Sequence, residues 1–149
     1  MLFRTHILFG LAAFMLASNF MTTNYIFLFL VLLGSILPDI DEKHSKMNQW
    51  AGIFGNLTVF LTKHRGIIHS LPFNFLLLST ISFFFGTYYA IALTFGYVSH
   101  LLADSLTPMG VHLFYPFSNF RIKGPIKTGS FLENILALFL FVFIAIQLF

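Results

Sequence analysis

The sequence predicts an all-α membrane protein: about five membrane-embedded helices, a short interfacial helix, and a polar site at the cytoplasmic face. The first observation behind this prediction is composition. Of the 149 residues, 58% are hydrophobic and 9% are charged, and the mean hydropathy is +0.88. These values are typical of integral membrane proteins and not of soluble domains. The second observation is that several apolar stretches approach the roughly 20 residues that a bilayer-spanning helix needs. We expect one helical membrane domain over residues 1–149.

Five apolar segments are expected to form the membrane helices, with short polar turns between them. They are Ile7–Met21, Tyr25–Leu37, Ile67–Phe85, Tyr88–Ala103 and Leu132–Phe149. The first two are short for full spans, so a thinned membrane or a partly re-entrant placement stays open. The first segment follows a basic residue as a signal peptide does, but Ala17-Ser18-Asn19 is a poor cleavage site, and we expect an uncleaved helix. The tight links predict that the first and second helices, and the third and fourth, form antiparallel hairpins.

A short amphipathic helix is predicted over Lys46–Thr62, between the second and third membrane segments. Its apolar residues recur with helical spacing, and polar residues lie off that stripe. Ser45 is the expected N-cap, and Trp50 is the expected anchor in the membrane interface.

The third observation is the placement of charge. All eight Lys and Arg residues lie before the first segment, between the second and third, or between the fourth and fifth. With alternating topology they share one side of the membrane, and the positive-inside bias makes that side cytoplasmic. The sequence therefore predicts a multi-pass protein of the inner or plasma membrane, with its N-terminus and its polar site in the cytoplasm. The basic residues are spread over loops, so no nucleic-acid partner is expected.

Histidines and aspartates gather at the same cytoplasmic helix ends. His100 and Asp104 are four residues apart and face the same side of a helix. Asp39 and Asp41 follow a proline, and two carboxylates so close favour a divalent cation between them. Imidazole nitrogen and carboxylate oxygen are both good zinc ligands. The full set of candidate ligands is His6, Asp39, Asp41, His64, His69, His100 and Asp104.

Each member of this set also has a plainer explanation, such as a His–Asp hydrogen bond or a helix-ending turn. Seven N and O ligands from four helix ends nevertheless indicate a divalent metal site, with zinc the first choice and room for two or three ions. Metals there would activate water and offset charge on an anionic ester. Asp39 or Asp41 would orient the water or take its proton, and Arg65 would offset charge on the phosphoryl oxygens. The chain has no Cys, which excludes thiolate ligands and disulfides.

Several short motifs resemble a known family. They are Thr5-His6 with Gly10, Leu37-Pro38-Asp39-Ile40-Asp41, His64-Arg65-Gly66 through His69-Ser70, Gly96-Tyr97 through Ser99-His100 with Asp104, and Thr107-Pro108 with Gly110. Together they are similar to the membrane-bound metal-dependent hydrolase family of YdjM-like inner-membrane proteins. The resemblance covers most of the chain, from His6 to about Pro116.

The resemblance implies a metal-dependent hydrolase related to the zinc-dependent phospholipase C and single-strand nuclease fold, which holds several zinc ions. On that basis His100 and Asp104 bind zinc, and His6, Asp39, His64 and His69 supply further ligands. Relatives often place His directly after the second Asp, where this chain has Glu42 and then His44. His44 and His112 are therefore not counted among the ligands.

Three functions are compatible with these observations. The leading expectation is a hydrolase acting on a phosphoester, such as a phospholipid or another lipid-linked phosphate, at the cytoplasmic membrane face. A divalent-cation transporter is the alternative, although transporter sites tend to lie near the midplane, often between internal repeats. A non-catalytic membrane protein with a structural metal is the third, but seven ligands exceed the four that a closed zinc site needs.

Overall fold

A computed structural model describes residues 1–61 and 66–148. Within these residues the chain is all-α, as predicted, and its only β-type pairing is the isolated antiparallel bridge between Val111 and Ile122. The helical elements are α1 (Phe3–Ser18), α2 (Tyr25–Ile36), η1 (Leu37–Asp41), α3 (Lys46–Ala51), α4 (Ile53–Leu61), η2 (Ile67–His69), α5 (Leu71–Phe85), α6 (Thr87–Ser105) and α7 (Phe131–Leu148).

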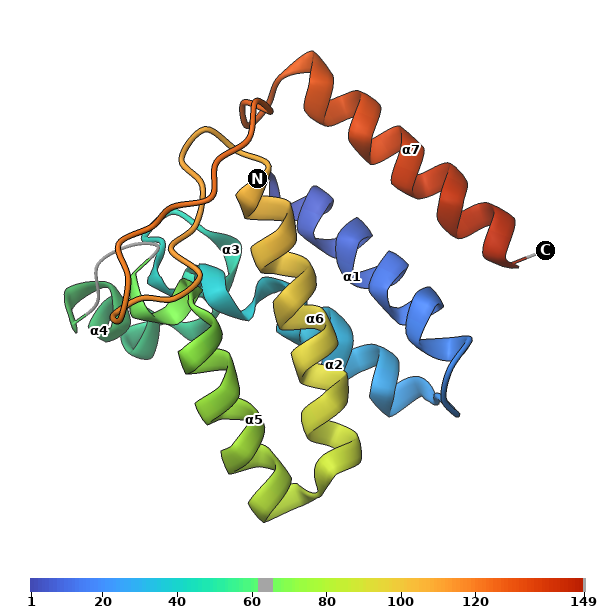
Figure 1. Cartoon of the computed structure of the whole chain (residues 1–149), viewed down its shortest axis with the longest axis horizontal. Coiled ribbons are helices and arrows are strands. Elements are labelled where there is room, and N and C mark those ends of the chain that lie inside the picture. The colour runs from blue at the N-terminus through green and yellow to red at the C-terminus, as the bar shows by residue number, and fades with distance from the viewer. Residues whose placement is uncertain (62–65, 149) are drawn as a thin grey trace.

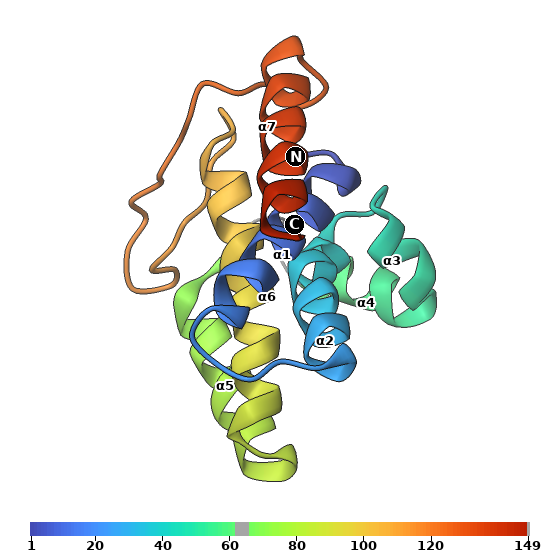
Figure 2. The same ribbon diagram turned by 90° about the vertical axis from the view of Figure 1, so that its right-hand side faces the viewer.

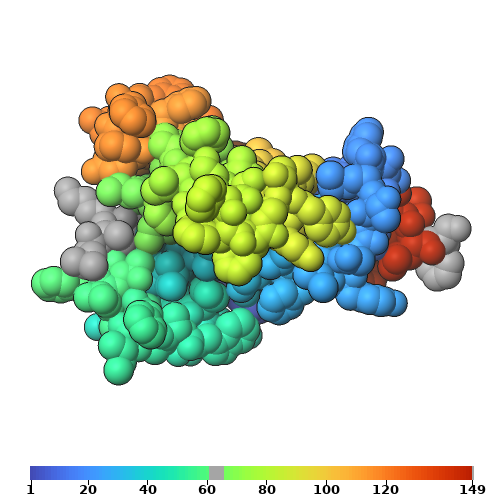
Figure 3. Space-filling model, turned by 90° about the horizontal axis from the view of Figure 1, so that it is seen from below, coloured from blue at the N-terminus to red at the C-terminus, as the bar shows by residue number. Residues whose placement is uncertain are grey.

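Helices α1 and α2 form one antiparallel hairpin, and α5 and α6 form another, as the tight links predicted (Figure 1). The two hairpins meet most extensively through α2 and α6. Helix α7 packs against α1 on the far side from α5, which Figure 2 shows from the side. The space-filling view from below shows the α5–α6 hairpin across the middle of the molecule and the C-terminal helix at one end (Figure 3).

Glycines allow α2 and α6 to approach each other at backbone distance. A Cβ at Gly34 would clash with the Leu93 carbonyl, and a Cβ at Gly96 would clash with the Val31 carbonyl. Small residues at such contacts are the usual means by which membrane helices pack closely. This contact places the end of α2 directly against the last turns of α6.

The predicted interfacial helix, whose last residue Thr62 lies outside the described residues, is two helices in the structure. Gly52 separates α3 from α4 with φ +58°, a left-handed conformation that glycine adopts without steric cost. The predicted cap is confirmed, because the Ser45 hydroxyl accepts a hydrogen bond of 2.9 Å from the backbone N–H of Asn48. Trp50 is 66% exposed, as an interfacial anchor requires.

The predicted third membrane helix is divided as well. Ser70 is the N-cap of α5 and Pro72 lies in its first turn, so the α-helix begins at Leu71 and not at Ile67. His69 consequently lies in the short 3₁₀ turn η2, ahead of the helix. Its side chain therefore lies just before the N-terminus of α5, near His100 and Asp104. We call this end of the molecule the polar end.

Helix α7 is the one element of the described chain that is both long and apolar enough to span a membrane, with 18 residues and a mean hydropathy of 2.3. Helices α1 and α5 are apolar but have 16 and 15 residues. At 1.5 Å per residue they reach about 24 Å, short of the roughly 30 Å hydrocarbon core. The prediction of about five membrane helices is thus confirmed for helical structure, but five full spans are not.

Glu133, in the first turn of α7, is fully buried and ties that helix to the start of α1. One carboxylate oxygen accepts from the Leu2 N–H at 2.8 Å and from the Thr5 hydroxyl at 2.7 Å. The other accepts from the Gly129 N–H at 2.6 Å. Three donors around one buried carboxylate make a strong anchor, because hydrogen bonds to charged groups are each worth about 1.5–3 kcal/mol.

Replacing Glu133 with Gln is expected to destabilise the protein by about 2–4 kcal/mol, because a neutral amide keeps one acceptor but places an NH₂ group against a donor. Thermal unfolding in detergent, followed by circular dichroism, measures the effect. Replacement of the exposed Asn134 by Ala, in the same turn, is the control and should change stability by much less. Equal stability of the Glu133→Gln protein and wild type would contradict the anchoring role.

A candidate metal centre at the polar end

Six of the seven predicted ligands converge at one end of the helices. His6 comes from the first turn of α1, His100 and Asp104 from the last two turns of α6, and the others from η1 and η2. Five of the six side chains are essentially buried, and Asp39 alone keeps 17% of its side chain exposed. His64 and Arg65, the remaining predicted site residues, lie outside the described residues.

His69, His100 and Asp104 form the first potential ligand group. The Nε2 atoms of the two imidazoles are 3.3 Å apart, and each lies 3.7–3.8 Å from the Asp104 Oδ2 atom. An ion equidistant from these three atoms would lie about 2.1 Å from each, which is the length of zinc–nitrogen and zinc–oxygen bonds. The spacing of the donor atoms therefore fits a small divalent metal without rearrangement.

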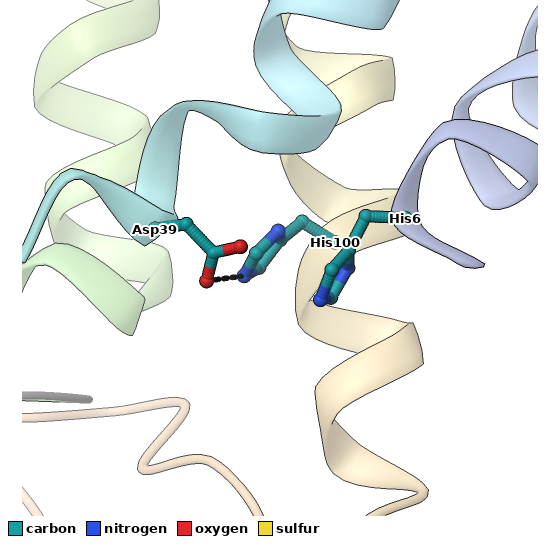
Figure 4. Close-up of side chains that lie close together, drawn as sticks. All are labelled: His6, Asp39 and His100. Carbon is teal, nitrogen blue, oxygen red and sulfur yellow. Dashed lines mark ion pairs between the residues drawn. The ribbon is translucent and has the colours of Figure 1, made fainter. Parts of the chain in front are cut away.

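His6, Asp39 and His100 form a second potential group, shown in Figure 4. The two imidazole rings stack with centroids 3.9 Å apart and planes 11° from parallel. The His100 Nε2 atom lies 3.7 Å from Asp39 Oδ1, and the His6 Nε2 atom lies 3.6 Å from Asp104 Oδ1. Asp104 thus faces His69 and His100 with Oδ2 and His6 with Oδ1, and Oδ1 also accepts a hydrogen bond of 2.7 Å from the Met1 amino group.

The backbone of α2 determines which nitrogen of His100 faces the centre. His100 Nδ1 lies 2.8 Å from the Ser35 carbonyl oxygen, and a carbonyl can only accept, so Nδ1 carries the proton. Ser35 is in the last turn of α2, where carbonyls lack intrahelical partners, and Pro38 has no N–H to offer it. The Nε2 lone pair of His100 is thereby directed at Asp39, His69 and Asp104, as a metal-ligating histidine requires.

Asp41 occupies the equivalent position behind His69. Its Oδ2 atom lies 3.4 Å from His69 Nδ1, on the opposite edge of the ring from His100 and Asp104. A carboxylate there orients the imidazole and raises its basicity as a ligand. The sequence predicted Asp41 as a direct ligand, whereas this geometry favours an orienting role. The sequence around Asp41 cannot distinguish a direct ligand from an orienting residue, because both roles need a carboxylate near a histidine.

His6 gives an independent test of whether a metal fits. Its ring is fully buried, and neither ring nitrogen makes a hydrogen bond to the described part of the protein. The Asp104 contact of 3.6 Å is too long to be one. An unsatisfied buried polar atom costs about 1–3 kcal/mol, and a metal bound to one of the nitrogens would remove that cost. The residues present therefore fit a divalent metal.

Changing Asp41 to Asn tests the orienting role. The amide removes the charge that polarises His69 but keeps its size, so we expect metal affinity to fall about 10–100-fold while the metal number per chain at saturation is unchanged. Competition with a fluorescent zinc chelator measures the affinity. If saturating metal instead falls by a whole equivalent, Asp41 is a direct ligand.

Two histidines stand apart from the centre, as the sequence suggested. His112 is engaged by Arg121, whose guanidinium donates to its Nε2 at 2.8 Å, and its Nδ1 lies 3.1 Å from the Asn119 carbonyl. His44 is exposed and lines a cavity that also reaches Asp39. The amino group of Met1 lies 2.7 Å from Asp104 Oδ1 and contributes positive charge at the cluster.

The sequence interpretation did not include the Ser35 carbonyl or Glu133. A backbone carbonyl has no residue-type signature, so the only hint of its role was the proline three residues later. Glu133 had a clearer signal, because it is the one charged residue in a mostly apolar C-terminal helix.

Comparison with known proteins supports the motif resemblance. A model of the YdjM inner membrane protein family matches residues 1–148, almost the whole chain. The chain belongs to this family. Membrane localisation, expected from composition, is thereby supported.

This YdjM-family chain is 35% identical over 120 residues to "Inner membrane protein YdjM" of Escherichia coli strain K12, and it matches the Shigella flexneri protein of the same name equally well. That alignment covers 74% of this chain and 61% of each relative, so the chain spans less than two thirds of their length. A third relative, "Uncharacterized protein YvsG" of Bacillus subtilis strain 168, is 32% identical over 111 residues, covering 69% of this chain and 66% of the relative. No solved structure shows a significant match.

Proposed function

We propose that this member of the YdjM family is a metal-dependent hydrolase of phosphoesters at the cytoplasmic face of the inner membrane. The observation that carries the proposal is the buried triangle of His69, His100 and Asp104, whose donor atoms are spaced for zinc. A bound zinc would supply Lewis-acid stabilisation of the phosphoryl oxygens and make water nucleophilic at neutral pH.

The residues around the cluster suit this chemistry. Asp39 is the one carboxylate of the cluster that is partly exposed, and it lines a cavity open to the polar end of the molecule. It is placed to orient a water molecule and to take its proton, whereas the buried Asp104 serves as a ligand. Arg65 is proposed, from the sequence alone, to offset charge on the phosphoryl oxygens.

The position of the cluster favours hydrolysis over transport. All of its described residues lie at helix ends on one side of the molecule, whereas transporter sites lie near the bilayer midplane. The six described basic side chains (Arg4, Lys43, Lys46, Arg121, Lys123 and Lys127) are all exposed. They come from the end of the molecule that holds the cluster or from the segments joined to it, and the positive-inside bias therefore supports a cytoplasmic position for the cluster.

The test is hydrolysis of bis(p-nitrophenyl) phosphate and p-nitrophenyl phosphate by detergent-purified protein loaded with zinc or manganese. We expect turnover that chelation abolishes and metal restores. Asp39→Asn should retain part of the metal and lower the turnover number by about 10²–10⁴-fold, the range that general acid–base catalysis supplies. A metal-loaded protein that hydrolyses neither ester, nor any phospholipid in mixed micelles, would contradict the proposal.

A further inference from the structure

A cavity of about 310 Å³, lined by both apolar and ionisable side chains, opens beside the metal-ligand cluster. Asp39 lines it and connects it to the cluster, since the same carboxylate contacts His100. The rest of its wall comes from the start of α1, the loop before α3 and the long segment between α6 and α7. Its lining residues are Met1, Leu2, Phe3, Asp39, Glu42, His44, Ser45, Lys46, Met109 and Thr128.

Lys46 provides the basic side chain of this cavity. Its ammonium lies 4.7 Å from the centre of the Phe3 ring, a cation–π contact that holds it over the cavity wall. Glu42 lines the same cavity, so an occupant meets both signs of charge next to Asp39. A phosphodiester headgroup suits this lining, with its phosphate near Lys46.

An apolar groove of about 480 Å³ lies next to the cavity, between α1, α2 and α3. Its lining residues are Ile7, Phe29, Leu32, Leu33, Ile36, Met47, Trp50 and Ala51. None of these side chains is charged. On the surface of a membrane protein such a groove has the chemistry of an acyl-chain site.

The same two helices line both spaces. Helix α1 contributes Phe3 to the cavity and Ile7, one turn later, to the groove. Helix α3 contributes Lys46 to the cavity and Trp50, also one turn later, to the groove. Phe3 and Trp50 meet edge to face, with ring centroids 5.7 Å apart, at the boundary between the two. A molecule with a charged head and an apolar chain can therefore occupy both spaces at once.

We propose that the substrate is a bilayer phospholipid whose phosphate binds beside Lys46 and Asp39 while one acyl chain lies in the groove between α1, α2 and α3. The inference rests on the proposed function and specifies its substrate. It also identifies the side of the bundle from which the substrate enters, past Trp50.

A second groove serves as an internal control. It lies between α2, α5 and α6, has a volume of about 500 Å³, and is as apolar as the first. Its lining includes Leu77 and Ile81 of α5 but no residue of the cavity beside the metal-ligand cluster. Any lipid should contact this groove, but without a preference for the headgroup.

The experiment is photo-crosslinking of the full chain in vesicles of phosphatidylethanolamine and phosphatidylglycerol. One sample carries a phosphatidylglycerol with a diazirine in one acyl chain, and the other carries a diacylglycerol with the same chain and no phosphate. Mass spectrometry maps the adducts. We expect phosphatidylglycerol to label the α1–α2–α3 groove roughly fivefold more than diacylglycerol, the scale of one basic residue's attraction for an anionic headgroup. The α2–α5–α6 groove should be labelled equally by both.

Three variants sharpen the result. Ala51→Trp, which fills the first groove, should abolish its labelling, and Lys46→Glu should abolish the preference for phosphatidylglycerol. Leu77→Trp, in the control groove, should change neither. Equal labelling by the two probes, or labelling that survives Ala51→Trp, would overturn the inference.

The two proposals fail in distinguishable ways. Groove labelling with the expected preference, in a protein that hydrolyses no phosphoester, supports the lipid site and overturns only the hydrolase. Metal-dependent hydrolysis of bis(p-nitrophenyl) phosphate without preferential groove labelling overturns the lipid site and leaves the hydrolase intact.

Discussion

Replacement of either His100 or Asp104 by Ala is expected to abolish metal binding. His100 belongs to both potential ligand groups, and Asp104 faces His6 with one oxygen and His69 with the other. Losing either removes a donor that no other described side chain can replace at that position. The effect should exceed the 10–100-fold loss that follows removal of an orienting partner.

Elemental analysis of detergent-purified protein, dialysed against zinc or manganese, measures the metal content per chain. Wild type is expected to hold at least one equivalent, and each variant none. His112→Ala is the matched control, because His112 is half-buried and bound to Arg121 away from the cluster. A variant that retains full metal content while His112→Ala loses it would place the site elsewhere, and a wild type that takes up no metal would remove the basis for the hydrolase.

Gly96→Ala is expected to unsettle both the fold and the metal site. The added methyl group would meet the Val31 carbonyl, a backbone atom that cannot rotate away. Overpacking of this kind costs about 1–3 kcal/mol, more than the roughly 1 kcal/mol that Ala gains over Gly in helix propensity. Separation of α6 from α2 also lengthens the 2.8 Å contact between His100 and the Ser35 carbonyl. We therefore expect a lower melting temperature together with weaker metal binding.

Circular dichroism on heating and chelator competition measure these two effects in the same preparation. Thr80→Ala, on the exposed face of α5, is the control and should change neither. Unchanged metal affinity in a destabilised Gly96→Ala protein would show that the α2–α6 contact supports the fold without orienting His100.

Some helix ends were predictable because local signals mark them. Ser45 caps α3 as predicted, and Pro38 follows the end of α2. The predicted start of the third membrane helix at Ile67 was wrong, because Ser70 caps α5 and the helix begins at Leu71. Gly52 was a weaker signal, since glycine lowers helix propensity without specifying a break. The division at Gly52 depends on its backbone conformation, with φ +58°, which the residue type permits but does not require.

Composition and residue spacing alone determined that this is a helical membrane protein and that its histidines and aspartates gather at one end. Hydropathy, helical periodicity and the asymmetry of charge can be read from the sequence without knowing how the helices pack. The packing decided which atoms of those residues face one another. Backbone contact at Gly34 and Gly96 sets the register of α2 against α6, and that register places the Ser35 carbonyl on His100. The packing also places Asp41 next to Nδ1 of His69 and not next to Nε2, which faces His100. The sequence does not show this, because the relative position of side chains on different helices depends on contacts between residues far apart in the chain.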